Sequence, residues 1–453
     1  MKAFDIVILA AGKGERMVSD KPKVMHEIMG KPMIDYVIEL AQKLGPVKII
    51  VVTGYGRKLV EVHLKGAPVV CAVQNEQKGT AHALLSTENL LDDGDVLVLY
   101  GDVPLIELAT LQGFLSFYQK KGCITFMTTD VADPTGYGRV ITDGDNIVAI
   151  REEIDASAEE RAIRRINTGI CMIPQTSFPY LKEIDAANKK GEYYLTDICR
   201  IARDRRDIAK VFHHGVSSEV LGINSQKELT EANITMKTRL LERHMKNGVS
   251  FLDSNVYVES AVEIGKDTTI FPNCFLAGKT VIGRGVTIGP NVVIRNCTIH
   301  DNVNIDGFVV MEGAEVKEGV KVGPFSRLRP TTVVEKGAKI GNFVEVKNSV
   351  IGEDSKANHL AYIGDAEIGQ HVNIGAGTIT CNYDGIKKHK TVIEDNVFVG
   401  SNTELVAPVT VGKDAVIGAG STIIKNVPEG ALAISRVQQK HIEGYGRKKK
   451  CVE

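Results

Sequence analysis

Several features that would place a chain outside the cytoplasm are missing from this sequence. It has no apolar run long enough to cross a membrane, and its start, MKAFDIVILAAGKG, lacks the leader and cleavage site of a signal peptide. Eight cysteines are scattered without a CxxC pair, which argues against a disulfide framework and a zinc site. The 55 Lys and Arg nearly balance the 56 Asp and Glu, so no field of one sign invites nucleic acid. We predict a cytoplasmic protein with free thiols whose partners are small molecules or other copies of the chain.

The first half of the chain reads as an α/β domain. Its 453 residues exceed what one hydrophobic core usually organises, so at least two domains are expected. Up to about residue 222, short β-branched runs alternate with helical patterns, which is typical of a mostly parallel, Rossmann-like sheet. The expected strands are 6–9, 47–53, 69–73 and 96–100, and the expected helices are 33–44, 80–90 and 108–120. Ligands of such sheets bind beyond the carboxyl ends of the strands.

The second half has a different period. Aliphatic residues recur at every sixth position through 264–294, 316–346 and 393–423. A helix of period 3.6 cannot keep every sixth residue on one face, and an alternating strand would need more apolar positions. Hexapeptide repeats form an all-β, left-handed parallel β-helix with the aliphatic side chains inside, and this is the fold we predict.

Between the halves, residues 226–245 carry apolar side chains at helical spacing without proline or glycine. We therefore predict an α/β domain at 1–224, a helical linker at 225–250 and a β-helix domain at 251–453. The final segment, EGYGRKKK and beyond, is expected to form a loosely held basic tail.

A glycine-rich loop follows the first expected strand. Gly12 and Gly14 allow backbone N–H groups to approach phosphate oxygens, and Lys13, Arg16 and Lys23 add positive charge. The loop lacks the third glycine of a dinucleotide fingerprint and the GKS/T of a Walker A loop. Taken alone, it could equally be an ordinary turn between a strand and a helix.

A carboxylate ends another expected strand, where Gly101 is followed by Asp102. Carboxylates suit Mg²⁺, which keeps several waters while it bridges one or two protein oxygens to substrate phosphates. The alternative is that Asp102 only stabilises a turn. Together with the phosphate loop, the carboxylate favours the metal.

The string LAAGKGERM followed by PK resembles the LxxGxGTxM…PK signature of sugar-1-phosphate nucleotidyltransferases. Glu15 stands where that signature usually has threonine, so a hydroxyl contact to phosphate is not expected there. Strings along nearly the whole chain resemble the family of bifunctional N-acetylglucosamine-1-phosphate uridyltransferases and glucosamine-1-phosphate acetyltransferases. They include QKGT, GYGRV, INTG, GEYYLTD and LGINS.

This resemblance implies residues for uridylyl transfer. Asp102 and Asn224 would hold Mg²⁺, with Gln74 and residues 77–80 around the uracil. The residues implied to bind UTP or the UDP-sugar are Leu9, Ala10, Gly12, Lys23, Gln74, Gly79, Thr80, Tyr100, Gly101, Asp102, Gly138, Glu152, Asn167, Tyr194, Thr196 and Asn224. A phosphate monoester is already nucleophilic, so positioning and charge neutralisation by Lys23, Arg16 and the metal suffice without a catalytic base.

The hexapeptide register breaks where polar residues gather, which suggests a binding groove. A histidine at such a corner, His359, is by itself more often solvated than catalytic. NHLAYIGDAEIG and NIGAGTITCNYDG, however, resemble the acetyltransferase half of the family, which implies that His359 is the catalytic base. The same resemblance implies that glucosamine 1-phosphate is bound by Arg329, Lys347, Tyr362, Asn373, Asn382 and Tyr383. It implies that acetyl-CoA is bound by Ala376, Asn382, Tyr383, Ser401, Ala419 and Arg436.

The function predicted from both halves is synthesis of UDP-N-acetylglucosamine from UTP, acetyl-CoA and glucosamine 1-phosphate, by way of N-acetylglucosamine 1-phosphate. Family resemblance adds a homotrimer with acyl sites between subunits, and a role in peptidoglycan and lipopolysaccharide synthesis. Two alternatives stay open: a single nucleotidyltransferase whose β-helix only assembles subunits, and a regulatory scaffold without catalysis.

Overall fold

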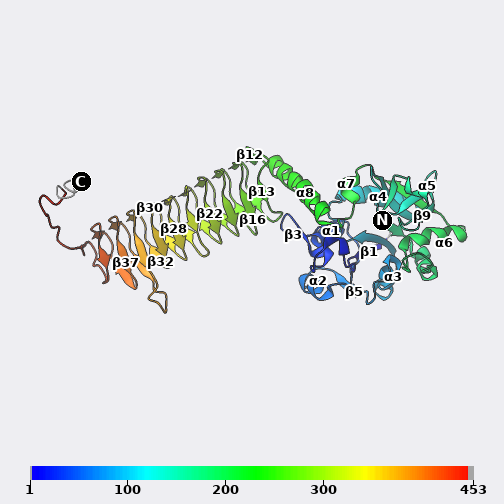
Figure 1. Cartoon of the computed structure of the whole chain (residues 1–453), viewed down its shortest axis with the longest axis horizontal. Coiled ribbons are helices and arrows are strands. Elements are labelled where there is room, and N and C mark those ends of the chain that lie inside the picture. The colour runs from blue at the N-terminus through cyan, green and yellow to red at the C-terminus, as the bar shows by residue number, and fades with distance from the viewer. Residues whose placement is uncertain (1–2, 447–453) are drawn as a thin grey trace, which may run out of the picture. The chain divides into compact units, whose positions relative to one another are not determined.

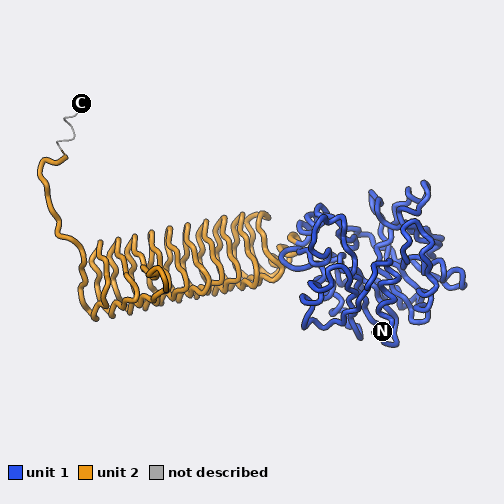
Figure 2. The backbone as a smooth tube through the Cα atoms, turned by 60° about the horizontal axis from the view of Figure 1, so that its bottom comes forward, with its two compact units in different colours: residues 1–236 blue, residues 237–453 orange. Residues whose placement is uncertain are grey.

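The computed structural model describes residues 3–446 of the chain. The chain divides into two compact units, residues 1–236 and 237–453 (Figure 2). The division falls inside the helix α8 (Gln226–Lys246), which covers the expected linker helix. Residues 447–453, with Cys451 and most of the predicted basic tail, lie outside the described residues.

Unit 1 is built on one nine-stranded sheet in the order β5-β4-β1-β6-β10-β7-β11-β9-β8. The first four of these strands are parallel, whereas β10 runs antiparallel to both β6 and β7, so the sheet is mixed. The strands are β1 (Phe4–Leu9), β4 (Ile49–Thr53), β5 (Val70–Val73), β6 (Asp95–Tyr100), β7 (Ile124–Asp130), β8 (Arg139–Asp143), β9 (Asn146–Arg151), β10 (Arg165–Ile173) and β11 (Ala209–His213). A separate hairpin joins β2 (Glu27–Ile28) to β3 (Lys31–Pro32).

Helices cover both faces of this sheet (Figure 1). Along β1, Ile6 and Ile8 enter the core that includes helices α1 and α4, while Val7 and Leu9 enter the core that includes α3 and α6. The helices are α1 (Met33–Lys43), α2 (Arg57–His63), α3 (Thr80–Leu85), α4 (Leu108–Lys121), α5 (Ala158–Arg161), α6 (Ile198–Asp204) and α7 (Ser217–Val220). No helix among the described residues has the length and apolarity needed to cross a membrane.

The single helix expected at 80–90 is divided in the structure. Helix α3 ends at Leu85, and a short 3-10 helix, η3, follows at Glu88–Leu90. The Ser86 hydroxyl donates to the Ala83 carbonyl at 2.6 Å, and the Thr87 hydroxyl donates to the Leu84 carbonyl at 2.7 Å. Such side-chain bonds compete with the continuing helix for its carbonyls, so the apolar period carries on while the helix does not.

Unit 2 is a stack of coils whose strands form three parallel sheets of eleven, ten and nine strands. The coils run from β12 (Ser250–Phe251) to β41 (Leu432–Ala433), as Figure 1 shows. A single apolar core fills the interior, and it contains the aliphatic residues that recur every six positions, with Ile264 packed against it. The predicted fold class, a nucleotidyltransferase sheet followed by a left-handed parallel β-helix, is confirmed.

Candidate functional sites

The glycine loop after β1 carries the stem of Lys23 across it. Gly14 has φ +67°, and a Cβ atom built on it would lie 2.8 Å from Lys23 Cβ. Lys23 begins the 3-10 helix η2 (Lys23–Met25), directly after Pro22. No described atom lies within 4 Å of a Cβ built on Gly12, so the loop keeps open space on that side. The lysine is therefore led over the loop toward the ends of the central strands.

At the end of β6, three polar side chains meet. The Lys23 ammonium donates a short hydrogen bond to Asp102 Oδ2 and a second one, of 2.6 Å, to Asn224 Oδ1. Backbone bonds hold the two acceptors in register, since the Ile223 N–H donates to the Asp102 carbonyl at 2.9 Å. Only 11% of the Lys23 side chain and 16% of the Asp102 side chain are exposed. The structure thus brings together the three residues expected at the phosphate and metal end.

This donor set fits a divalent metal. A carboxylate oxygen and an amide oxygen converge on one cationic atom, the Lys23 nitrogen, which shows that the position suits positive charge. Across residues 3–446 no group of three or more His, Cys, Asp or Glu forms a metal-binding cluster. Two protein oxygens with the remaining positions left to water and phosphate are what Mg²⁺ prefers.

The other charged residues of the loop make contacts separate from the one between Lys23 and Asp102. Glu15, at the position where the nucleotidyltransferase signature has threonine, is exposed and pairs with Lys13 at 3.4 Å. The charge of the Glu15 carboxylate is thus neutralised by Lys13, and Glu15 takes no part in the contact between Lys23 and Asp102. Arg16 reaches toward Gly136, with its Nη1 atom 3.7 Å from a Cβ built there.

The expected uracil residues form one connected group. Gln74 is 4% exposed, and its amide donates to the Gly79 carbonyl at 3.0 Å. Gly79 has φ +109°, and a Cβ atom on it would lie 2.5 Å from the Tyr193 carbonyl oxygen, so only glycine fits. The Thr80 hydroxyl accepts from the Leu195 N–H at 2.9 Å. This group is therefore fixed by backbone contacts to the segment that carries the residues expected at the sugar.

The expected sugar residues gather around a buried carboxyl. Glu152 accepts from the Thr196 hydroxyl at 3.3 Å, and a Cβ atom on Gly138 would lie 3.2 Å from Glu152 Oε1. Burial raises the pKa of Glu152 above its ordinary value. The Tyr194 hydroxyl is buried without a hydrogen-bond partner among the described residues. A buried hydroxyl of this kind is satisfied when a ligand supplies the partner.

The remaining expected residues frame these groups. Asn167 Oδ1 accepts from the Gly169 N–H at 3.0 Å, and a Cβ atom on Gly169 would lie 2.5 Å from the Tyr100 ring. The Gly101 N–H donates to the Leu9 carbonyl at 3.0 Å, which ties the ends of β6 and β1 together. Ala10 continues from Leu9 and donates its N–H to Val52 at 3.0 Å. These expected residues all lie at, or directly beside, the carboxyl ends of the strands β1 and β6.

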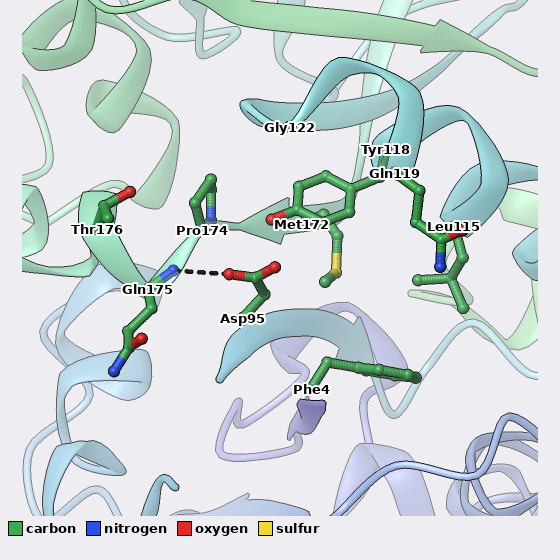
Figure 3. A pocket seen from close by; sticks show the side chains of 10 residues that line it. All are labelled: Phe4, Asp95, Leu115, Tyr118, Gln119, Gly122, Met172, Pro174, Gln175 and Thr176. Carbon is green, nitrogen blue, oxygen red and sulfur yellow. Dashed lines mark hydrogen bonds between the residues drawn. The ribbon is translucent and has the colours of Figure 1, made fainter. Parts of the chain in front are cut away.

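A cavity of about 280 Å³ lies at the opposite end of the same strands (Figure 3). Phe4 and Asp95, which line it, are the first residues of β1 and β6, and Asp95 accepts from the Gln175 N–H at 3.0 Å. None of the residues expected to bind nucleotide or sugar lines this cavity. It is separate from the contact between Lys23 and Asp102.

In unit 2, the basic residues expected to hold phosphate are aligned from coil to coil. Arg329 follows β25 (Arg327–Leu328), and its N–H donates to the carbonyl of Val346, one residue before Lys347 at the end of β28 (Glu345–Lys347). On the next coil, Gly364 is the residue that pairs with Lys347 and so continues this alignment. The Arg329 guanidinium forms an ion pair of 3.0 Å with Glu345.

Lys388 joins this group, although sequence reasoning missed it. The ammonium of Lys347 lowers the pKa of Lys388, because two positive charges lie within hydrogen-bonding range of one another. Lys388 belongs to the excursion between β34 (Ile379–Cys381) and β35 (Thr391–Ile393). No motif distinguishes it from the other two lysines of this segment, at 387 and 390. Lys388 is recognised only because the segment folds back and brings it beside Lys347.

The polar residues expected around the sugar surround Gly364. A Cβ atom there would lie 2.5 Å from Tyr362 Oη and 2.8 Å from Asn382 Nδ2. The Asn382 amide donates a short hydrogen bond to Asp365, which also accepts from Asn348 at 2.6 Å. Burial alone would raise the pKa of Asp365, but these hydrogen bonds and the nearby lysines hold it below its usual value.

Two expected residues lie apart from this cluster. Tyr383 is 61% exposed, and its hydroxyl donates to the Gly385 carbonyl at 2.6 Å within the same excursion. Asn373 starts β33 (Asn373–Ile374) on the neighbouring sheet, where it pairs with Lys356. The structure therefore leaves Tyr383 outside the lysine cluster and places Asn373 on an adjoining face.

His359 begins a line of residues along one corner of the coils. It is exposed at the end of β30 (Lys356–His359). On following coils, the Ala376 carbonyl accepts from Asn402, and Gly420 donates to the Ser401 carbonyl at 2.8 Å. The Arg436 guanidinium donates to the Ala419 carbonyl at 2.7 Å. His359 and the residues expected to bind acetyl-CoA, Ala376, Ser401, Ala419 and Arg436, thus follow one corner.

Comparison with known proteins covers both units. A family model described as nucleotidyl transferase matches residues 5–215, and one described as bacterial transferase hexapeptide (six repeats) matches residues 261–296 and 390–425. A curated relative in Thermodesulfovibrio yellowstonii, named bifunctional protein GlmU, is 47% identical and covers 99% of this chain and 100% of its own. One of the same name in Caldanaerobacter subterraneus subsp. tengcongensis is 48% identical over 98% of each chain. A solved UDP-glucose pyrophosphorylase complexed with UDP-glucose is 23% identical, with a TM-score of 0.43, and covers 52% of this chain and 99% of its own.

Proposed function

Because the chain belongs to the family of the bifunctional GlmU proteins, we propose that its two sites carry out two successive transfers. As a member of that family it is an enzyme that makes UDP-N-acetylglucosamine, with one acetyltransferase activity and one uridyltransferase activity. The observation that carries the assignment of residues is the convergence of Lys23, Asp102 and Asn224 beside the glycine loop.

In uridylyl transfer, the phosphate oxygen of N-acetylglucosamine 1-phosphate attacks the α-phosphorus of UTP, and pyrophosphate leaves. The family uses a divalent metal, which we propose is Mg²⁺ held by Asp102 and Asn224. The metal, when bound, neutralises charge on the phosphates. Lys23 and Arg16 neutralise the remaining charge. Glu152, Thr196 and Tyr194 orient the sugar, so that its phosphate is in line with the leaving group.

In acetyl transfer, His359 accepts a proton from the amine of glucosamine 1-phosphate as the nitrogen attacks the thioester carbon of acetyl-CoA. The new C–N bond forms, the C–S bond breaks and coenzyme A leaves as a thiolate that takes up a proton. Histidine is the side chain that most often serves as a general base near neutral pH, so it suits this task. We assign the Ala376 N–H to stabilise the oxyanion, and the position of Ala376 after His359 along the same corner supports this assignment.

We assign Lys388 to the phosphate clamp with Arg329 and Lys347, and expect its loss to act on substrate binding. Replacing Lys388 with alanine should raise the KM for glucosamine 1-phosphate about tenfold and leave kcat little changed, because the ammonium binds phosphate equally before and during the reaction. Steady-state acetyl transfer, followed by thiol release, measures both constants.

Lys387→Ala is the matched control for this variant. It removes the same charge from the preceding residue of the excursion, and it should leave the KM within about twofold, since solvent screens an exposed charge that does not contact the ligand. Equal effects of the two substitutions would show that the excursion attracts phosphate only by its total charge.

We propose that the enzyme acts as a homotrimer in which the β-helices associate. Support comes from an exposed apolar ridge on successive coils, made of Phe308, Phe325, Phe343 and Leu360. The three phenyl rings are stacked at 4.9 and 5.3 Å. All four residues have positive φ, between 48° and 62°, and are 46% to 62% exposed. The left-handed conformation costs such side chains about 1–2 kcal/mol each, and a neighbouring copy that covers the ridge would add apolar burial that offsets this cost.

Asparagine takes the same corner at Asn273, Asn291 and Asn402, where φ is also positive. The double variant F325N/F343N therefore keeps a residue that tolerates this conformation and removes the apolar surface. We expect this variant to form smaller species, as measured by sedimentation, and to lose acetyl transfer while it keeps its fold.

Ile424→Asn is the control. It alters an exposed side chain outside the ridge and should leave the mass of the assembly unchanged. A double variant that keeps the mass of the unaltered protein would remove the support that the ridge gives to the homotrimer.

The proposed function as a whole is tested with Mg²⁺, UTP, acetyl-CoA and glucosamine 1-phosphate together. Appearance of UDP-N-acetylglucosamine with an equal amount of free thiol supports both assignments. Thiol release without nucleotide sugar would show that the uridyltransferase half is inactive. The absence of both products would favour a scaffold without catalysis. The seven cysteines among the described residues are free thiols, and together with the cytoplasmic pools of UTP and acetyl-CoA they support a cytoplasmic location.

A further inference from the structure

Lys23 contacts the two oxygens that we assign to the metal, and this inference rests on that assignment. Its ammonium reaches Asp102 Oδ2 and Asn224 Oδ1 at hydrogen-bonding distance. A divalent cation bound to the same oxygens would stand within a few ångströms of the ammonium, where two positive charges repel strongly. Lys23 and the metal therefore compete for one position.

The two oxygens are held in place, so the competition cannot be relieved by moving them. The side-chain amide of Asn224 donates to the Gly222 carbonyl at 2.9 Å, which turns the Asn224 Oδ1 atom toward Lys23. The backbone N–H of Asn224 donates to the Glu228 carboxylate at 2.6 Å. The segment that carries Asn224 is tied to Asp102 through the backbone, because the Ile223 N–H donates to the Asp102 carbonyl at 2.9 Å. Lys23 is the long, flexible member, and its stem lies against Gly14 of the phosphate loop.

We propose that Lys23 is a tethered stand-in cation, which excludes the metal until a triphosphate on the glycine loop draws its ammonium away. The stem passes over the loop, so a bend of the side chain brings the ammonium to phosphate without backbone movement. Metal and nucleotide then bind together, because each favours the arrangement that admits the other. Lys23 thus sets the order in which the site fills, in addition to neutralising charge.

The test measures metal binding to the full-length enzyme without nucleotide. Mn²⁺ is the probe, and the paramagnetic resonance signal of free Mn²⁺ reports its binding. Replacing Lys23 with methionine keeps the length of the side chain and removes the charge, so we expect Mn²⁺ to bind at least about tenfold more tightly than to the unaltered enzyme. A lysine that does not compete would leave the affinity unchanged, and one that supports the metal site would lower it on removal; either result overturns the proposal.

Lys13→Met is the matched control, since it removes a lysine from the same loop that is 59% exposed and pairs with Glu15. It should change the Mn²⁺ affinity by no more than about twofold. If K23M does not fold, as judged by circular dichroism, Lys23→Gln gives the same measurement with a polar side chain. A tenfold gain in both K13M and K23M would mean that only total charge matters, which also contradicts competition at Asp102.

Asp102→Asn separates this inference from the proposed function. Mn²⁺ binding that is lost in K23M/D102N shows that the measured site is the assigned one. If D102N has no effect on binding, the metal site itself is wrongly assigned. If D102N abolishes binding but K23M binds no more tightly than the unaltered enzyme, the metal site stands and the competition by Lys23 fails.

Discussion

Asp102→Ala lowers the rate of uridylyl transfer on the order of a thousandfold and leaves acetyl transfer within about twofold. The expected loss is large because the carboxylate is one of two protein oxygens assigned to the metal, and charge neutralisation supplies most of the catalysis in phosphoryl transfer. Among the described residues, the variant leaves the Lys23 ammonium with Asn224 as its hydrogen-bond partner. Pyrophosphate release and thiol release, measured on the same preparation, report the two activities separately.

Asp95→Ala is the control for this variant. Asp95 starts β6, the strand whose far end leads to Asp102, and its carboxylate accepts from the Gln175 N–H. Removing this carboxylate should lower the free energy of unfolding by about 1 kcal/mol. The rates of uridylyl transfer and acetyl transfer should stay nearly unchanged. Near-normal uridylyl transfer in D102A would refute the metal role, whereas equal losses in both variants would indicate a general effect of disturbing β6.

His359→Ala should lower acetyl transfer by a factor between about 10² and 10⁴ and leave uridylyl transfer unchanged. This is the usual contribution of a positioned general base. His359 is exposed at a β-helix corner, so its loss creates no cavity in the core, and the effect should appear in kcat without a change in thermal stability. Thiol release from acetyl-CoA is the measurement.

His371→Ala is the matched control, since His371 is, like His359, an exposed histidine on the β-helix. It should retain full acetyl transfer. If H359A keeps more than about a tenth of the rate, the base is another group and the function of the polar cluster around Gly364 needs a different explanation.

Much of the fold could be predicted because its signals are local and repeated. The six-residue period places one aliphatic side chain on each face of each coil, and the same residues fill the core. The four predicted strands occur in the structure with ends shifted by at most two residues. The mixed character of the sheet was not apparent, because the antiparallel placement of β10 depends on pairing across the chain rather than on its own composition.

The candidate sites divide in the same way. Lys23 and Asp102 stand in strings that mark them in sequence, but the contact between them spans 79 residues and the one to Asn224 spans 201. No local pattern could show that the lysine reaches both oxygens. Lys388 carries no motif, and only the return of its excursion to Lys347 selects it from its neighbours. Likewise, the apolar ridge is visible only once coils 17 or 18 residues apart are stacked.

The central claim is that one chain performs two chemically independent transfers, and phosphorus resonance spectra of a single reaction test it directly. D102A, supplied with Mg²⁺, UTP, acetyl-CoA and glucosamine 1-phosphate, should accumulate N-acetylglucosamine 1-phosphate and form no nucleotide sugar. Steady formation of UDP-N-acetylglucosamine by that variant, or a failure to acetylate the sugar phosphate at all, would contradict the division of labour proposed for the two sites.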